Sequence, residues 1–139
     1  MSLAVEHPPE RQTILSDEGS RINGIIRELV NRTGAELALV VRTEGAVIAR
    51  AGMMQANDLE DVGILSALIY ASAQSIGGLL KTRVSYVHQH GEQKDLLILK
   101  IDPAAALIVA FGEPLGLGGI LYTARRSAKE LKELLGGFA

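Results

Sequence analysis

The sequence predicts an α+β domain built on one five-stranded antiparallel sheet, with its elements in the order αββαβββα. A length of 139 residues, of which 47% are hydrophobic, suits a single compact domain with its own core. Three segments repeat apolar residues at helical spacing, and five short runs have the composition of strands. The last three runs are joined by short links at 91–94 and 102–105, which leave no room for a crossover helix, so these strands must pair antiparallel.

The first helix is expected to follow a loose leader. Residues 1–15 include two adjacent prolines among charged neighbours and are predicted to be flexible, so the single domain is expected to span 16–139. Ser16 and Asp17 are suitable N-caps for the helix, and Gly34 is a suitable stop.

Strand patterns follow directly. Residues 35–42 are apolar on both faces, which predicts an interior strand, and a turn at 43–45 leads into a second strand over 46–51.

At the other end of the chain, residues 117–135 predict a terminal amphipathic helix. Its apolar stripe consists of Leu117, Ile120, Leu121, Ala124, Ala128, Leu131 and Leu135.

A long middle helix is predicted to open with a capping box of Asn57 and Glu60 and to end near Lys81. Within it, residues 62–80 carry no charge, and at 100° per residue both sides are apolar. The side expected to face the sheet holds Val62, Leu65, Ile69, Ala73, Ile76 and Leu80. The side expected to face outward holds Ile64, Ala67, Leu68, Ala71, Ser75, Gly78 and Leu79, many of them small.

An apolar outward face needs a cover, and small residues let a second helix approach closely. We therefore interpret this face as a helix–helix interface between subunits. Two alternatives are burial inside a monomer and a membrane span. Polar residues within the helix and the tightly linked strands after it argue against the span, so no membrane insertion is expected.

The run after the middle helix, residues 83–90, has the polar pattern of an edge strand. Val84, Tyr86, His88 and His90 are expected to point to one side of it. Pairing of this edge with its own copy, beside paired middle helices, would make one continuous sheet across a homodimer. The predicted partner or dimer interface therefore combines Val84, Tyr86 and His88 with the outward face of the middle helix.

Composition excludes several functions. There is no cysteine, the net charge is −2, and only 4% of residues are aromatic, so disulfides, thiol chemistry and nucleic-acid binding are not expected. The N-terminal residues do not resemble a secretory signal, and we expect a cytoplasmic protein. Neither a G-x-x-x-x-G-K-[ST] nucleotide-binding loop nor a G-x-S-x-G nucleophile motif occurs, so no catalytic residues are assigned and enzymatic activity is not expected.

Two other patterns are weighed and set aside. The glycine-rich stretch 112–119 precedes a helix, as phosphate loops do, but its spacing fits tight turning and close helix–sheet packing better. His88 and His90 could bind a metal together, yet no third ligand is spaced along the sequence to complete the set. Neither a cofactor nor a metal is expected.

The order of elements resembles the roadblock-type dynein light chain family, especially its bacterial MglB-like members, described as regulators of Ras-like GTPases. The matching text INGIIRELVNRTGAELALVVRTEGAVIARAG gives a helix, Gly34, a strand, the Gly45 turn and a second strand. The likeness extends over about residues 20–135. One departure is Arg42-Thr43-Glu44 at the first hairpin, where the family often has aspartates, which puts the surface chemistry of that turn in question.

The resemblance implies a homodimer with packed middle helices and a continuous sheet. It further implies a small Ras-like GTPase, MglA-like and of the gliding-motility and cell-polarity type, bound on the platform that the paired helices form. The expected function is that of a non-enzymatic regulator or scaffold that modulates nucleotide hydrolysis or exchange. A small-molecule-sensing module and a purely structural bridging module are the alternatives.

Overall fold

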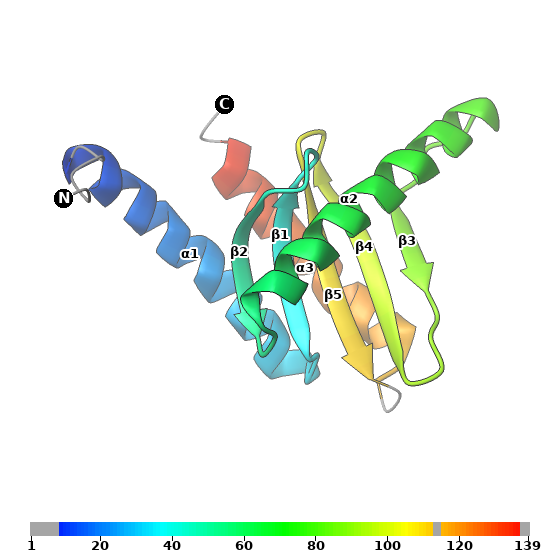
Figure 1. The fold of residues 1–139 in the computed structure, drawn as a ribbon, viewed down its shortest axis with the longest axis horizontal. Coiled ribbons are helices and arrows are strands. Elements are labelled where there is room, and N and C mark those ends of the chain that lie inside the picture. The colour runs from blue at the N-terminus through cyan, green and yellow to red at the C-terminus, as the bar shows by residue number, and fades with distance from the viewer. Residues whose placement is uncertain (1–8, 113–114, 137–139) are drawn as a thin grey trace.

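The computed structural model describes residues 9–112 and 115–136, with side chains from Gly19 onward. It confirms the predicted element order and the five-stranded antiparallel sheet, whose strands lie in the order β2-β1-β5-β4-β3 (Figure 1). The helices and strands are α1 (Pro9–Thr33), β1 (Leu37–Arg42), β2 (Val47–Gly52), α2 (Ala56–Leu79), β3 (Tyr86–Gln89), β4 (Lys94–Asp102), β5 (Ala105–Gly112) and α3 (Leu117–Gly136).

The molecule has three layers, with the sheet between two layers of helices, because the interior strands are apolar on both faces (Figure 1). Helices α1 and α3 cover one face, and α2 lies alone across the other (Figure 1). Alternate residues of β1 show the division, since Ala38 and Val40 belong to the core beneath α1 and α3, whereas Leu37 and Leu39 belong to the core beneath α2. As predicted, β1 is an interior strand and β3 is an edge strand.

Helix α2 lies close to the sheet at two glycines. A Cβ on Gly63 would lie 2.8 Å from Cγ2 of Val47, and one on Gly77 would lie 2.7 Å from Cγ2 of Val84 and 3.0 Å from the Thr82 carbonyl oxygen. Both glycines are buried. The missing side chains therefore allow the helix backbone to approach the β2 side at one end and the chain leading into β3 at the other.

We expect Gly77→Ala to lower the free energy of unfolding by about 1–3 kcal/mol, because the new methyl group would push the helix from the backbone of Thr82. Gly24→Ala is the matched control: Gly24 is exposed on α1 and has nothing within 4 Å of the position that a Cβ would take, so alanine should raise stability by up to about 1 kcal/mol. Urea unfolding at one fixed protein concentration measures both. Equal effects of the two substitutions would refute close packing at Gly77.

Several element ends differ from the sequence prediction. Helix α1 begins at Pro9, so Ser16 and Asp17 lie inside it, and only residues 1–8 of the predicted leader fall outside the described chain. Proline suits a first helical turn, where its missing N–H leaves no hydrogen bond unmade. Helix α2 has Gln55 as its N-cap, just before the predicted Asn57 capping box, and the cap makes no side-chain hydrogen bond.

The glycine-rich stretch also differs from its interpretation. Gly116, Gly118 and Gly119 have nothing within 4 Å of the position that a Cβ would take, so close helix–sheet packing does not explain them. Leu115 N donates a hydrogen bond to the Gly112 carbonyl at 3.2 Å, which fits the expected tight turn. Residues 113–114 of the stretch lie outside the described residues.

Candidate functional site

The outer face of α2 is the largest apolar feature among the exposed side chains that the structure describes. The helix turns Leu59, Gly63, Ser66, Tyr70 and Gly77 toward the sheet. Its opposite side carries Ile64, Leu65, Leu68, Ala71, Ser72, Ser75, Ile76, Gly78 and Leu79, which we call the outer face of α2. Leu65 and Leu68 are each 58% exposed, and Leu79 is 84% exposed. A contiguous apolar surface of this kind is typical of an interaction site.

The predicted site residues on α2 fall mainly on this surface. Ile64, Leu68, Ala71, Ser75 and Gly78 are exposed, as expected. Ala67 is an exception, because it is only 8% exposed and lies on the sheet side.

The prediction for the inward side of α2 was also wrong in part. Leu65, Ile76 and Leu80 were expected against the sheet, but all three are more than half exposed. The reason is steric: the two tightly packed glycines and Ser66 set the line that faces the sheet, and the larger aliphatic residues are turned away from it. The exposed face is consequently richer in leucine and isoleucine than predicted.

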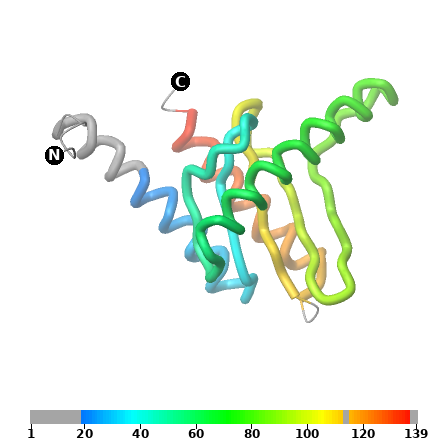
Figure 2. Tube along the Cα trace, viewed as in Figure 1, coloured from blue at the N-terminus to red at the C-terminus, as the bar shows by residue number. Residues whose placement is uncertain are grey.

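The C-terminal part of α2 extends beyond the edge of the sheet. It runs diagonally from β2 past β3, and the chain then turns back to enter β3 (Figures 1 and 2). Gln74 Nε2 donates a hydrogen bond to the Val84 carbonyl at 2.8 Å, which ties the projecting helix to the returning chain. Leu79 and Leu80 are both more than two-thirds exposed near its tip. No other residue that the structure describes covers this apolar end of the helix.

Tyr70 lies on the inner side of α2, in the core between this helix and the sheet. Its hydroxyl is buried and has no hydrogen-bond partner among the described residues. The nearby Gln74 side chain slightly lowers the pKa of the Tyr70 hydroxyl. Burial dominates and raises the pKa of Tyr70 above its usual value, so the phenol stays protonated. Tyr70 therefore acts as a packing residue between α2 and the sheet.

Strand β3 has one strand neighbour, β4, and is shorter than predicted. Tyr86 and His88 point toward the α3 side, where the Arg125 guanidinium lies 5.6 Å from the centre of the Tyr86 ring and the His88 ring stacks on Phe111. Val84 does not share their side, since it lies against Gly77 of α2. The predicted alternation fails there because Val84 precedes the strand, where the backbone is not extended in register with β4.

The exclusion of a third metal ligand was wrong. Asp95, at the start of β4, lies against both histidines: its Oδ2 is 2.6 Å from His88 Nε2, and its Oδ1 is 3.0 Å from His90 Nδ1. The hairpin pairs Gln89 with Leu96, which brings Asp95 opposite the end of β3. The sequence could have revealed Asp95 if a register had been assumed for the hairpin that closes at residues 91–94, because the residues facing His88 and His90 could then be counted off.

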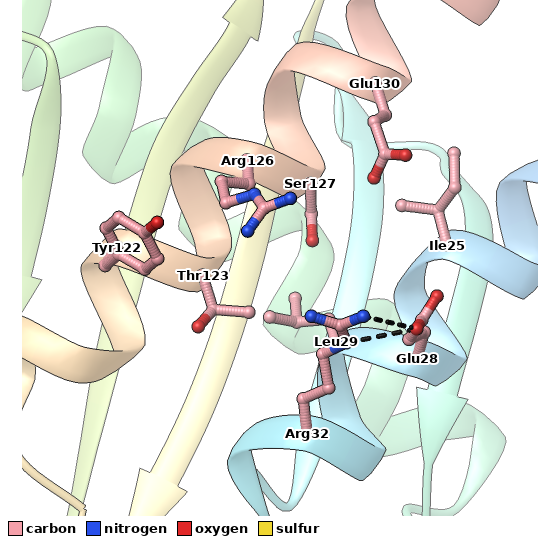
Figure 3. Close-up of a pocket in the computed structure, with 9 residues that line it drawn as sticks. All are labelled: Ile25, Glu28, Leu29, Arg32, Tyr122, Thr123, Arg126, Ser127 and Glu130. Atoms are coloured by element: carbon pink, nitrogen blue, oxygen red, sulfur yellow. Dashed lines mark hydrogen bonds and ion pairs between the residues drawn. The ribbon is translucent and has the colours of Figure 1, made fainter.

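On the face opposite α2, a hollow lies between α1 and α3 (Figure 3). Arg32 is paired with Glu28 within it, and Arg126 and Glu130 line its other side. Its volume is about 120 Å³, well below the roughly 300 Å³ at which small-molecule pockets begin. A larger depression of about 420 Å³ is lined by residues of α3 alone, so it is open to solvent and could not enclose a ligand. Neither hollow favours a small-molecule sensor.

By length and composition, the most apolar stretch of α2 could cross a membrane. In the fold only 28% of that stretch is buried, but Gly63 and Gly77 pack tightly on the sheet. Helices that cover the core of a soluble protein share this composition, so the apolar stretch is weak evidence for a membrane span. A soluble protein fits the structure.

No protein-family model matches the chain, and no curated protein matches its sequence. Solved structures do resemble it. Myxococcus xanthus MglB superposes with a TM-score of 0.82 at 20% identity, over 88% of this chain and 92% of that one. A structure described as MglB with tetrameric arrangement gives 0.79 at 25% identity, over 84% and 89%. A Roadblock/LC7 domain from Streptomyces avermitilis gives 0.76 at 17% identity, over 81% and 96%. The chain thus has a roadblock-type, MglB-like fold.

Proposed function

We propose that the chain forms a homodimer in which the outer faces of two α2 helices pack together and the β3 edges pair. The exposed leucines and isoleucines of α2 supply the driving force, since burying each such side chain contributes about 1.5–3 kcal/mol. The projecting end of α2 reaches past β3, so a second copy docked on it would lie beside the open edge of the same strand (Figure 1). An isologous two-fold contact satisfies both surfaces at once.

We further propose that this dimer is a non-enzymatic regulator that binds a Ras-like small GTPase, MglA-like in type, and modulates its nucleotide hydrolysis or exchange. The observation that carries the proposal is the MglB-like fold over most of the chain, together with an apolar helical surface suited to a protein partner. The proposed setting is the cytoplasm, and the proposed process is gliding motility or cell polarity.

The regulation is proposed to work by holding the partner's switch segments in a productive arrangement. Single-turnover GTP hydrolysis by the Ras-like GTPase encoded nearest to this chain tests it, with and without the dimer at saturating concentration. A changed hydrolysis or nucleotide-release rate supports the regulator. Binding with no rate change would replace it with the bridging module, and no binding would refute both.

An arginine donated in trans is the competing mechanism. Arg42, Arg50 and Arg83 are exposed and are the candidates. We expect alanine at each to lower the stimulation by less than about tenfold, whereas a donated arginine contributes about 10³ to 10⁵ in rate. Ala71→Glu, on the outer face of α2, should instead abolish complex formation, because the charge disrupts the paired helices on which the partner is proposed to bind. A thousandfold loss from one arginine at saturation would establish a donated finger and overturn the scaffolding mechanism.

A further inference from the structure

A compact cluster of metal-binding side chains lies on the β3–β4 hairpin. His88 comes from β3, His90 follows its last residue, and Asp95 is near the start of β4. One potential ligand atom from each side chain lies within 4.8 Å of the other two. His88 Nε2 and His90 Nδ1 approach different oxygens of the same carboxylate, at 2.6 and 3.0 Å, so all three groups converge on one point.

We propose that His88, His90 and Asp95 bind one divalent transition-metal ion, with Zn²⁺ as the metal that the donor set suits. Two imidazoles and one carboxylate are common zinc ligands, and three protein ligands leave a fourth position for water or another donor. Tetrahedral bonds of 2.0–2.1 Å would place the ligand atoms roughly 3.4 Å apart. The closest pair of ligand atoms is 2.6 Å apart, and all three lie within 4.8 Å of one another, which is near that spacing.

Two of the three ligands are held in place before a metal arrives. The His88 side chain is 26% exposed, and its ring lies nearly parallel to Phe111, whose side chain is fully buried. The Asp95 side chain is 17% exposed and accepts a hydrogen bond from the Gly91 N–H at 3.3 Å. Ligands fixed by packing and by neighbouring hydrogen bonds lose little freedom on binding a metal.

The turn between the strands also holds a fixed shape. A Cβ on Gly91 would lie 2.2 Å from the Lys94 carbonyl oxygen, so the hairpin closes at a place that only glycine permits. Lys94 is the cation next to Asp95 in sequence, but its ammonium pairs with Glu36 at 3.3 Å and is drawn to the opposite side of β4. The carboxylate is therefore left to the two histidines.

The donor set of the cluster suits a cation. It combines one carboxylate with two imidazole nitrogens, and no side-chain ammonium or guanidinium is recorded in contact with that carboxylate among the described residues. His90 is 80% exposed and leaves the fourth position open to solvent.

Zinc chloride titrated into the full chain, followed by calorimetry and by thermal unfolding, tests the site without any GTPase. We expect one Zn²⁺ per chain and a raised unfolding temperature, because the metal crosslinks β3 to β4. His90→Gln and Asp95→Asn should each weaken binding by at least about tenfold. These substitutions keep the size of the side chains nearly unchanged, and circular dichroism verifies that each variant folds.

His7→Gln is the matched control, since His7 is the third histidine of a chain without cysteine and lies outside the described residues. This variant should bind Zn²⁺ as tightly as the wild type. Magnesium chloride should give no binding, because Mg²⁺ prefers oxygen ligands alone. Absence of saturable Zn²⁺ binding by the wild type, or unchanged affinity in both site variants, would overturn the proposal.

Discussion

Leu68→Glu should convert the proposed homodimer into a folded monomer. Leu68 lies near the middle of the outer face of α2 and is 58% exposed in the single chain, so the substitution removes little from the fold itself. In a dimer that pairs these faces, two carboxylates would be buried close together without partners. We expect the dissociation constant to rise by at least about 100-fold, which corresponds to roughly 2.7 kcal/mol. Sedimentation equilibrium over a dilution series measures the change.

Tyr122→Glu provides the matched control for a new surface charge. Tyr122 is 65% exposed but lies on α3, in the opposite layer of the molecule. Its substitution should leave self-association unchanged. A strictly monomeric wild type at micromolar concentration would refute the homodimer, and an undiminished dimer in Leu68→Glu would move the interface away from α2.

Hydrogen exchange in the same samples separates the two halves of the proposed interface. If β3 pairs with its copy, the β3 amides that point away from β4 should exchange slowly in the wild type and quickly in the Leu68→Glu monomer. The amides of β4 serve as an internal reference, since this strand has neighbours on both sides in the single chain. Fast exchange of β3 in a dimeric wild type would leave α2 as the interface and exclude edge pairing.

The order of elements could be predicted from the sequence because periodicity is a local property. Apolar spacing identified each helix, and short links forced the last three strands to pair antiparallel. The same reasoning could not place the ends of α1 and α2. Helix α1 begins at Pro9 although Ser16 and Asp17 are better caps, and α2 begins beyond Gln55 without a side-chain cap. Good capping residues are thus a preference that the rest of the chain can override.

The rotation of α2 on the sheet was the main error at the site. A helix that is apolar all round has little difference between its sides, so periodicity gives no direction for its inner face. Close contacts at Gly63 and Gly77 decide that direction, and they depend on Val47 and on the chain around Val84, which lie outside the helix. Leu65 and Ile76 therefore point outward, and Ala67 is buried, against expectation.

Asp95 was missed for a related reason. Its partner His88 is seven positions away along the chain, and only the hairpin register brings the two side chains together. Sequence motifs for metal sites rely on ligands that are a few residues apart within one helix, strand or loop. A site that spans two paired strands appears only when the register is known.

The second large effect is expected at Gly52, where the end of β2 passes Glu36. Gly52 has φ of +113°, and a Cβ there would lie 2.2 Å from the Glu36 carbonyl oxygen and 2.8 Å from Cα of Leu37. These atoms are backbone and cannot rotate away as a side chain can. Gly52→Ala must therefore separate the ends of β1 and β2, which pair at Leu37 and Gly52. We expect a loss of at least about 3 kcal/mol in the free energy of unfolding.

Gly34→Ala separates this steric effect from the cost of backbone conformation. Gly34 also has a positive φ, +76°, but its nearest neighbour to a Cβ is the Leu115 side chain at 4.0 Å. Alanine there should cost only the conformational penalty, about 1–2 kcal/mol. Urea unfolding of both variants at one protein concentration, with equal denaturant slopes, provides the comparison. Similar losses in the two variants would contradict the steric argument and would mean that the ends of β1 and β2 move apart easily.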